Sequence, residues 1–329
     1  MMQDAIKNFN KQFKFRPKLE GGPSTSSGAS LKIKRYKTYI VCGMGGSHLA
    51  ANIMQTAMPE LDIVIHSDYG LPSLSEGRMK KTLVIASSYS GNTEETISGY
   101  EEARKKNISV IAIAVGGKLI DMAKKDNVPY VVLPGGIQPR SALGYSIKAL
   151  MKAMKLNDGI KQISELAKTL DPKSLEDEGK NLAQKLQGKV PVIYSSTRNY
   201  SIAYNWKIKF NETGKIPAFC NVLPELNHNE MTGFDVKDAS RKLSENFYFI
   251  FLKDAKDNPK LLKRMEVLEK LYKDRRLSVE ILDLKGENEF QKIFSSLVLA
   301  DWTALYTASA YGLESEQVPM VEEFKRLIS

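Results

Sequence analysis

The hydrophobic pattern of the chain alternates short apolar runs with longer stretches in which apolar residues recur at helical spacing. The apolar runs have the length and β-branching of strands that are buried on both faces of a parallel sheet. Strands that alternate with helices indicate an α/β fold, in which helices cover both faces of such a sheet. The expected strands are Thr38–Cys42, Asp62–Ser67, Leu83–Ala86, Val110–Val115, Tyr130–Leu133, Val190–Ser196, Asn246–Leu252 and Ser278–Leu284.

The pattern also predicts that the chain has two similar halves. The sequences VIASS at 84–88 and VIYSS at 192–196 end two of the expected strands at equivalent points. A short helix is expected around Ala5 to Phe13, and the Gly/Ser-rich stretch from Gly21 to Gly28 is typical of a flexible connection. The expected parts are an N-terminal segment at 1–37, a first domain at 38–156, a helical connection at 157–189 and a second domain at 190–329.

Composition narrows the class of protein. A chain of 329 residues with 42% hydrophobic residues is long enough for two cores. Residues 1–20 lack the continuous apolar region expected of a secretion signal, and no apolar run reaches membrane-spanning length. The two cysteines favour a reducing cytoplasm over a disulfide framework. The net charge of +10 is spread among acidic residues, so we expect a basic surface that attracts anionic metabolites, with neither nucleic acid nor a membrane as partner.

The turn after the strand Leu83–Ala86 is the strongest candidate for a ligand site. It reads Ser87-Ser88-Tyr89-Ser90-Gly91-Asn92-Thr93, and a helix with acidic residues in its first turn follows. Such a turn directs backbone N–H groups, hydroxyls and the positive end of a helix dipole towards one point, which suits an anion of phosphate size. The alternative is that Ser and Asn only cap the helix.

A glycine-rich turn, Gly43-Met44-Gly45-Gly46-Ser47, leads from the first strand into a helix at His48 to Thr56. Glycines let the backbone approach a ligand closely, and Ser47 lies at the helix N-terminus. The dinucleotide fingerprint is incomplete, because no glycine stands at its sixth position, so nucleotide binding is not favoured. Both turns follow the carboxyl ends of strands, where parallel sheets bind their ligands.

Three further residues are candidates for chemistry. Arg140 lies in the loop 134–142, at the start of the helix expected at Ala142 to Met154, either as a fixed cation beside the same site or as a surface arginine. Glu212 is near the end of a helix, and His228 lies in the polar segment Pro224–Glu230. A glutamate can act as a base, and a histidine among carboxylates and amides can exchange protons near neutral pH. The alternative for the polar segment is a capping and hydrogen-bonding network.

Together these motifs resemble those of one family. They are GMGGS at 43–47, SYSGNTEET at 88–96, QPRSALGY at 138–145, NE at 211–212 and PELNHNE at 224–230. In this order they resemble the bifunctional phosphoglucose/phosphomannose isomerases of the sugar-isomerase (SIS) domain superfamily, over nearly the whole chain after Lys37. SYSGNT alone indicates only an SIS domain, whereas QPRSALGY and PELNHNE indicate this branch.

The resemblance implies a fold and a reaction. The fold is two SIS domains, each a parallel flavodoxin-like sheet covered by helices on both faces. The reaction is the interconversion of glucose 6-phosphate or mannose 6-phosphate with fructose 6-phosphate through a cis-enediol, that is, glucose-6-phosphate and mannose-6-phosphate isomerase activity. Neither a metal nor a redox cofactor is expected. Family members are typically homodimers.

The resemblance also assigns roles to residues. Glu212 would transfer the proton between C1 and C2, His228 would open the sugar ring from across a dimer interface, and Arg140 would stabilise the enediolate. Thr303 is the expected counterpart of a threonine to which the dual specificity is attributed. The residues expected to hold the substrate phosphate are Ser47, Ser88, Ser90 and Thr93.

Two departures and two alternatives accompany this interpretation. His48 stands where the family usually has small residues, and no lysine occurs between Lys292 and Lys325, although related glucose isomerases bring a late lysine to the active site.

One alternative is a non-catalytic sugar-phosphate sensor that keeps the SIS phosphate loop. The other is an isomerase of another phosphosugar, such as an aminosugar or heptose phosphate. Glu212 and His228 favour catalysis.

Overall fold

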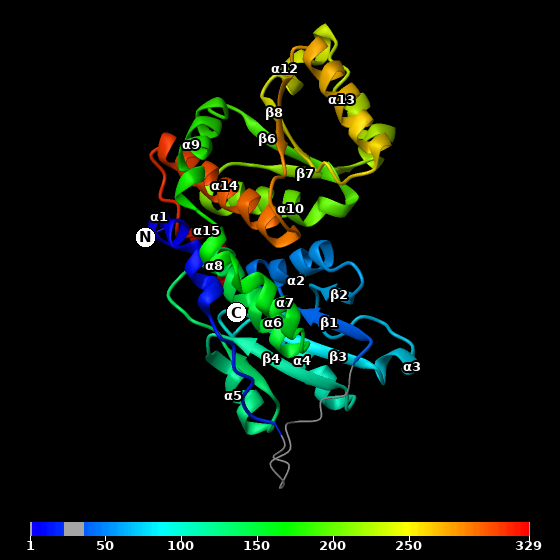
Figure 1. The fold of residues 1–329 in the computed structure, drawn as a ribbon, viewed down its shortest axis with the longest axis vertical. Coiled ribbons are helices and arrows are strands. Elements are labelled where there is room, and N and C mark those ends of the chain that lie inside the picture. The colour runs from blue at the N-terminus through cyan, green and yellow to red at the C-terminus, as the bar shows by residue number, and fades with distance from the viewer. Residues whose placement is uncertain (1, 23–35, 329) are drawn as a thin grey trace. The chain divides into compact units, whose positions relative to one another are not determined.

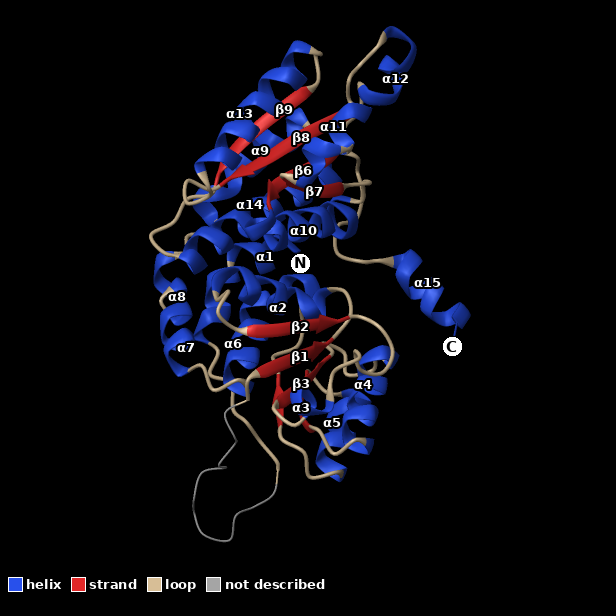
Figure 2. Cartoon of the chain, turned by 90° about the vertical axis from the view of Figure 1, so that its right-hand side faces the viewer, coloured by secondary structure: helices blue, strands red, loops and turns tan. Residues whose placement is uncertain are grey.

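The computed structural model describes residues 2–22 and 36–328, so most of the Gly/Ser-rich stretch at 21–28 lies outside the described residues. The chain divides into two compact units. Unit 1 comprises Met1–Asn8 and Leu170–Ser329, and unit 2 comprises Phe9–Thr169. Each unit is built on one parallel sheet with helices packed on it (Figure 1; Figure 2).

Unit 2 contains a five-stranded parallel sheet in the order β2-β1-β3-β4-β5. This is the flavodoxin-like order that the resemblance implied. β1 and β3 have a neighbouring strand on each side, and they are buried along their whole length because helices cover both faces of the sheet. The strands are β1 (Thr38–Cys42), β2 (Asp62–His66), β3 (Thr82–Ser87), β4 (Ser109–Ala114) and β5 (Tyr130–Val132).

Helices cover both faces of this sheet. On one face, Tyr100 of α4 and Leu119 of α5 share a core with Ile40 and Val84. Helices α2 and α6 pack against each other and against strands from the other face. The helices of unit 2 are α2 (Gly46–Ala57), α3 (Glu76–Met79), α4 (Glu94–Lys105), α5 (Gly117–Lys125), α6 (Leu143–Ala153), α7 (Asn157–Ser164) and α8 (Leu166–Thr169).

Unit 1 contains a four-stranded parallel sheet in the order β7-β6-β8-β9. The sequence did not predict β7, which lies at the edge of the sheet and pairs with β6. Its residues are mostly half-buried and include the polar Asn221, so they do not form the continuous apolar run of a central strand. The strands are β6 (Val190–Ser196), β7 (Phe219–Leu223), β8 (Phe247–Lys253) and β9 (Ser278–Asp283).

Aromatic rings fill the core on one face of this sheet. Tyr194, Phe249 and Phe251 of the strands pack with Tyr272 of α13, and the ring centroids of Phe249 and Tyr272 are 4.5 Å apart. Helices α9, α10 and α14 pack together in the same unit, with α10 against β6. The helices of unit 1 are α1 (Met2–Lys7), α9 (Glu176–Lys185), α10 (Tyr200–Lys209), α11 (Glu230–Gly233), α12 (Arg241–Ser244), α13 (Pro259–Asp274), α14 (Glu289–Ala310) and α15 (Pro319–Ile328).

The N-terminal segment differs from the prediction of one helix around Ala5 to Phe13. It forms α1, which belongs to unit 1, and then the 3-10 turn η1 (Phe9–Lys14), which belongs to unit 2. The side chain of Asn8 donates to the backbone carbonyl of Asp4 at 2.8 Å, and α1 ends there. The chain therefore crosses between the units at Asn8, as well as after α8.

The connection expected at 157–189 is divided in the same way. Helices α7 and α8 belong to unit 2, and α9 belongs to unit 1, where it packs along α14. Gly179 of α9 allows this close approach, since a Cβ there would lie 2.4 Å from Cβ of Trp302. These helices therefore complete the two units instead of forming a separate part.

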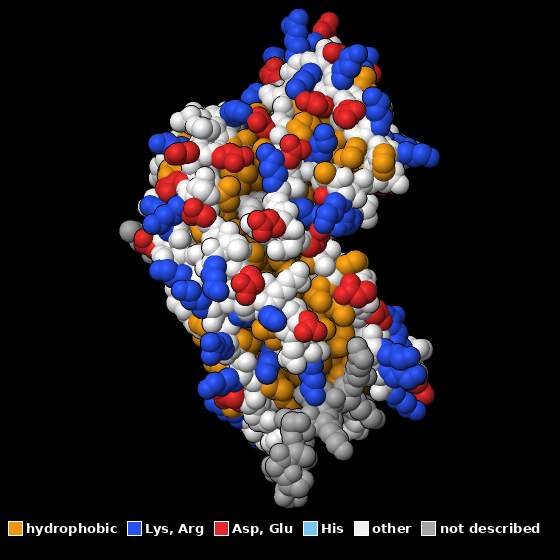
Figure 3. Space-filling model, in the orientation of Figure 1, with side chains coloured by type: hydrophobic (Ala, Val, Ile, Leu, Met, Phe, Trp, Pro, Cys, Tyr) orange, Lys and Arg blue, Asp and Glu red, His pale blue; other side chains and the backbone are white. Residues whose placement is uncertain are grey.

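The surface shows no concentration of one sign of charge on the face drawn in Figure 3, where Lys and Arg side chains are interspersed with Asp and Glu. Several of them form exposed pairs, such as Lys185 with Glu280 at 2.9 Å. None of the helices within residues 2–22 and 36–328 combines the length and apolar character that a membrane span requires.

Candidate active site

The glycine-rich turn and the hydroxyl turn are joined by direct hydrogen bonds at the carboxyl ends of β1 and β3 in unit 2. Ser47 Oγ accepts from the backbone N–H of Tyr89 at 2.9 Å, and Ser87 Oγ donates to the carbonyl of Ser47 at 3.0 Å. The turns are so close that a Cβ at Gly43 would lie 2.8 Å from the carbonyl oxygen of Ser87. The two predicted turns thus form one local structure.

Ser88 and Thr93 close the hydroxyl turn, with Oγ and Oγ1 2.8 Å apart. Ser88 Oγ also accepts from the backbone N–H of Gly91 at 3.1 Å. Gly91 has φ +77°, and a Cβ there would lie only 1.8 Å from the carbonyl oxygen of Gly116, so this position requires glycine. The turn is therefore held in one conformation by its own bonds and by the loop after β4.

At Thr93, the residue that precedes α4, the structure does not support the alternative that the turn only caps this helix. Thr93 is the N-cap of α4, yet its side chain makes no capping hydrogen bond and is bonded to Ser88 instead. Ser90 is exposed and accepts from the backbone N–H of Asn92 at 3.2 Å. An exposed hydroxyl beside a helix N-terminus is a suitable donor for an anion.

Arg140 is almost completely buried, with 1% of its surface exposed, so the surface alternative is wrong. It lies in the 3-10 turn η2 (Pro139–Ser141), whose backbone contacts the start of α2. A Cβ at Gly46 would lie 2.8 Å from the backbone nitrogen of Arg140. Arg140 Nη1 donates to Gln138 Oε1 at 3.4 Å. The backbone of η2 is thus in contact with the glycine-rich turn that precedes Ser47.

Glu212 lies in a one-turn π-helix, η5 (Phe210–Gly214), that follows α10. The sequence predicted an α-helix through Glu212, whereas the structure ends the α-helix at Lys209. Single π-turns occur frequently at functional sites. Lys215, with the left-handed φ of 59°, ends the turn, and its Nζ donates to the carbonyl of Glu212 at 2.7 Å. The Glu212 side chain is half-buried.

Helix α14 packs against this π-turn within unit 1. Lys209, which precedes the turn, pairs with Asp301 of α14 at 2.5 Å between Nζ and Oδ1, and both side chains are buried. Thr303, two residues further along α14, is 0% exposed, and its hydroxyl donates to the carbonyl of Leu299 at 2.8 Å. The segment that carries Thr303 therefore supports the turn that carries Glu212.

His228 ends the 3-10 turn η6 (Glu225–His228), and its side chain is exposed. Its ring has no hydrogen-bond partner among residues 2–22 and 36–328. The surrounding residues do form the network that was the alternative for this segment. The carboxylate of Glu230 accepts from the hydroxyl of Tyr194 on β6 and from Nδ2 of Asn221 on β7. This network attaches the segment to the sheet and leaves the imidazole accessible.

The two departures from the family pattern have structural counterparts. His48 lies in α2 and is 7% exposed, with Nδ1 2.6 Å from Oδ1 of Asn52 one turn later. Burial lowers the pKa of His48, although the bond to Asn52 acts in the opposite direction. Lys292, which precedes the stretch without lysine, is buried in an ion pair with Asp254 at 2.5 Å.

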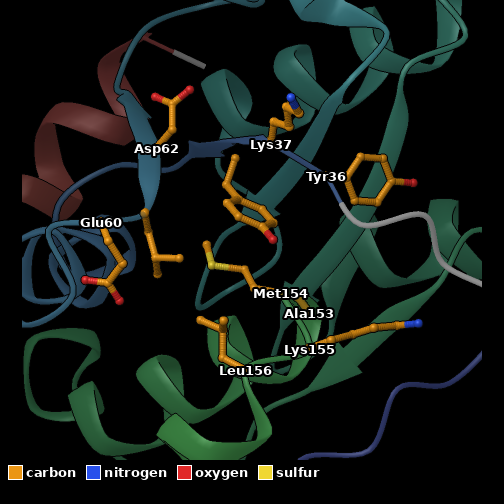
Figure 4. Close-up of a pocket in the computed structure, with 10 residues that line it drawn as sticks. Tyr36, Lys37, Glu60, Asp62, Ala153, Met154, Lys155 and Leu156 are labelled. Atoms are coloured by element: carbon orange, nitrogen blue, oxygen red, sulfur yellow. The ribbon is translucent and has the colours of Figure 1, made fainter.

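A pocket of about 470 Å³ opens at the other end of the strands in unit 2. Asp62 begins β2 and Lys37 precedes β1, so the pocket lies at the amino ends of the strands (Figure 4). The predicted phosphate turns follow the carboxyl ends, and the pocket is therefore separate from them. Its lining residues are Tyr36, Lys37, Tyr39, Glu60, Leu61, Asp62, Ala153, Met154, Lys155 and Leu156.

Comparison with known proteins identifies the family. A protein of Caldicellulosiruptor bescii named bifunctional phosphoglucose/phosphomannose isomerase is 33% identical over 317 residues, which cover 91% of this chain and 92% of that protein. This chain belongs to that family. A relative of the same name from Thermoplasma volcanium is 34% identical over 91% of this chain and 94% of its own length. A family model described as the bacterial phospho-glucose isomerase C-terminal SIS domain matches residues 175–328.

Solved structures support the fold. The crystal structure of a glucosamine-6-phosphate deaminase from Thermotoga maritima is similar with a TM-score of 0.68, covering 97% of this chain and 96% of that chain. At 15% identity this likeness shows the fold alone. The family resemblance and the α/β fold predicted from the sequence are thus confirmed.

Proposed function

We propose that the chain is an aldose-ketose isomerase that interconverts glucose 6-phosphate or mannose 6-phosphate with fructose 6-phosphate through a cis-enediol. The observation that carries this proposal is the identity of 33% and 34%, over about nine tenths of the chain, with relatives that bear the names of both activities. Phosphosugars are therefore the proposed substrates, and the proposed location is the cytoplasm.

The proposed phosphate site is the hydroxyl turn with its neighbour. Ser47, Ser88, Ser90 and Thr93 hold the phosphate, assisted by backbone N–H groups at the start of α4. The bond between Ser88 and Thr93 and the bond from Tyr89 to Ser47 support this assignment, because they fix the hydroxyl oxygens in one conformation before a ligand binds. A preformed site of this kind loses little conformational entropy on binding.

The proposed chemistry transfers protons at oxygen during ring opening and at carbon during isomerisation. His228 protonates the ring oxygen and takes up the proton that the C1 hydroxyl releases, which opens the ring to the aldehyde. Glu212 then removes the proton from C2, and the electron pair forms the C1–C2 double bond of the enediolate, whose charge Arg140 stabilises. The proton on the C2 oxygen passes to the C1 oxygen, and Glu212 returns its proton to C1 as the C2 carbonyl of the ketose forms. The residues return to their original protonation states, so that no cofactor is consumed.

The test is a coupled assay of fructose 6-phosphate formation from glucose 6-phosphate and, separately, from mannose 6-phosphate. Glu212→Gln is expected to abolish turnover of both sugars while binding survives, because the amide cannot accept a proton from carbon. Glu245→Gln, at an exposed glutamate of the same unit, is the matched control. A protein that binds both sugars and converts neither would be a sensor. Turnover of glucosamine 6-phosphate or a heptose phosphate instead would indicate the other alternative.

We further propose that the chain acts as a homodimer in which His228 serves the partner's active site. The exposure of His228 is compatible with this arrangement. Glu212→Gln and His228→Gln are each expected to be inactive alone. After unfolding and refolding together, they should recover roughly a quarter of the original activity, since half of the dimers are mixed and each mixed dimer has one intact site. No recovery, despite mixed dimers, would place His228 in the site of its own chain.

A further inference from the structure

Gln12 is a buried glutamine that connects the N-terminal segment to the Arg140 segment of unit 2. It lies in η1, and only 3% of its surface is exposed. Gln12 Nε2 donates to the backbone carbonyl of Ser141 at 2.7 Å, and Gln12 Oε1 accepts from the backbone N–H of Gly144 at 2.9 Å. The amide therefore satisfies one acceptor and one donor in the segment Gln138–Tyr145.

The bond to Gly144 substitutes for a helix cap. Gly144 is the second residue of α6, so its N–H has no acceptor within the helix. Ala142, the N-cap residue of α6, has no side-chain oxygen to offer and makes no capping bond. The side chain of Gln12 supplies the missing acceptor. Its close approach requires glycine at position 144, since a Cβ there would lie 2.7 Å from Cβ of Gln12.

The rest of η1 is anchored beside this contact. Lys148 of α6 donates through Nζ to the carbonyl of Phe13 at 2.5 Å and to Oγ of Ser164 at 2.8 Å. The rings of Phe15 and Tyr145 meet edge to face, with centroids 5.6 Å apart. These contacts hold η1 on α6, so that the amide of Gln12 has little freedom to move away from η2.

We propose that Gln12 is a positioning residue for Arg140, an inference that rests on the function proposed above for this arginine. Arg140 is the middle residue of η2, and Gln12 binds the carbonyl of the residue that follows it. By fixing that carbonyl and the first turn of α6, Gln12 holds the backbone of Arg140 against Gly46. The guanidinium then meets the enediolate charge without a prior rearrangement of the turn.

The test compares Gln12→Met, which keeps the size of the side chain and removes both hydrogen bonds, with Asn10→Leu. Asn10 lies on the same turn and donates to the carbonyl of Ala167 at 3.3 Å, away from η2. Gln12→Met is expected to lower kcat about ten-fold to a hundred-fold, because small displacements of a catalytic group have effects of this size, while KM changes little. Asn10→Leu should leave both near their original values.

A second readout separates positioning from general disruption. A pentonohydroxamate 5-phosphate imitates the planar anionic enediolate, whereas the corresponding pentitol 5-phosphate is a neutral chain with the same phosphate. In Gln12→Met the affinity for the hydroxamate should fall about ten-fold or more and that for the pentitol should stay the same, since only the former needs Arg140 in place. Gln12→Leu, which also removes both hydrogen bonds without burying a charge, serves if the methionine variant does not fold and should show the same selective loss.

The outcomes are distinguishable. An unchanged kcat in Gln12→Met, or an equal loss of affinity for both analogues, overturns the role of Gln12. If the unaltered protein converts neither sugar, the proposed function has failed. The ratio of the two affinities then still decides whether Gln12 positions Arg140 for an anionic ligand.

Discussion

Lys209 and Asp301 form an ion pair inside unit 1, with Nζ and Oδ1 2.5 Å apart and side chains that are 2% and 3% exposed. The pair joins the end of α10, just before the turn that carries Glu212, to α14, just before Thr303. Burial of two charges costs desolvation energy that offsets much of their attraction, so the pair need not stabilise the fold over an apolar pair of the same size. Loss of one member is a different matter, since it removes the opposite charge that compensates a buried charge.

Lys209→Met is therefore expected to lower the free energy of unfolding of unit 1 by about 3–5 kcal/mol. Lys209→Met combined with Asp301→Leu should recover most of this loss. Both tryptophans of the chain, Trp206 and Trp302, are buried in unit 1, so tryptophan fluorescence during urea unfolding reports on that unit. Lys273→Met is the control, because it breaks an exposed pair with Glu269 and should cost at most about 0.5 kcal/mol. Equal losses in the two lysine variants would contradict the argument.

Gly91→Ala should disrupt the turn that is proposed to bind phosphate without unfolding the protein. The added Cβ meets the carbonyl oxygen of Gly116 and requires a left-handed conformation that alanine adopts reluctantly, so the turn has to move. The affinity for inorganic phosphate and for glucose 6-phosphate, measured by calorimetry, is expected to fall about ten-fold or more. Gly77→Ala, where a Cβ has open space, should bind normally. Normal binding by Gly91→Ala would mean that phosphate is bound elsewhere.

Thr303→Val tests the proposed source of dual specificity. Valine matches the shape of threonine and removes the hydroxyl that donates to Leu299. We expect the ratio of kcat/KM for mannose 6-phosphate to that for glucose 6-phosphate to change several-fold, within the range of about 1–3 kcal/mol that a single contact supplies. Thr307 is buried and makes the same kind of bond, to the carbonyl of Thr303, which makes Thr307→Val the matched control. If Thr303→Val and Thr307→Val gave the same ratio of kcat/KM values, Thr303 would not be the source of the dual specificity.

His48 makes the stability of unit 2 depend on pH. Because burial lowers its pKa in the folded protein, the unfolded chain binds a proton near its ordinary pKa of about 6.5 that the folded chain does not yet bind. Stability should therefore be fully present above that pH and decrease as the pH falls through it towards the lowered folded pKa. Denaturation at a series of pH values, followed by tyrosine fluorescence, should show a smaller decrease for His48→Gln than for the unaltered protein. The variant at the other histidine of unit 2, His66→Gln, provides the comparison, and equal decreases in all three proteins would exclude His48 as the source.

The sequence predicted the elements whose signal is local. The apolar runs of β1, β3, β6 and β8 identify central strands, because such strands are buried on both faces. β7 was missed because its residues are mostly half-buried and include the polar Asn221, so that they form no continuous apolar run. The break of the N-terminal helix at Asn8 was missed as well, since it depends on which core each half of the segment joins.

In the candidate site, too, the features with a local sequence signal could be predicted and those that depend on distant residues could not. The glycine and hydroxyl turns could be predicted because their residues are adjacent in sequence and their chemistry is specific. The burial of Arg140 and Lys209 could not be predicted, because a charged residue is normally exposed and the partner of Lys209 lies 92 residues away. Gln12 offers no local signal at all, since its two bonds to η2 and α6 span 129 and 132 residues.

The division of the N-terminal segment between the units sets an order for folding during synthesis. Phe9–Thr169 leaves the ribosome as one continuous segment, and unit 2 contains all of its strands by then. α1 is made before unit 2, yet it packs on α14, with Lys7 above the ring of Trp302. Its buried residues, Met2 and Ile6, complete this packing only after α14 has emerged. The residues of α1 are thus translated before unit 2 but reach their final place after it.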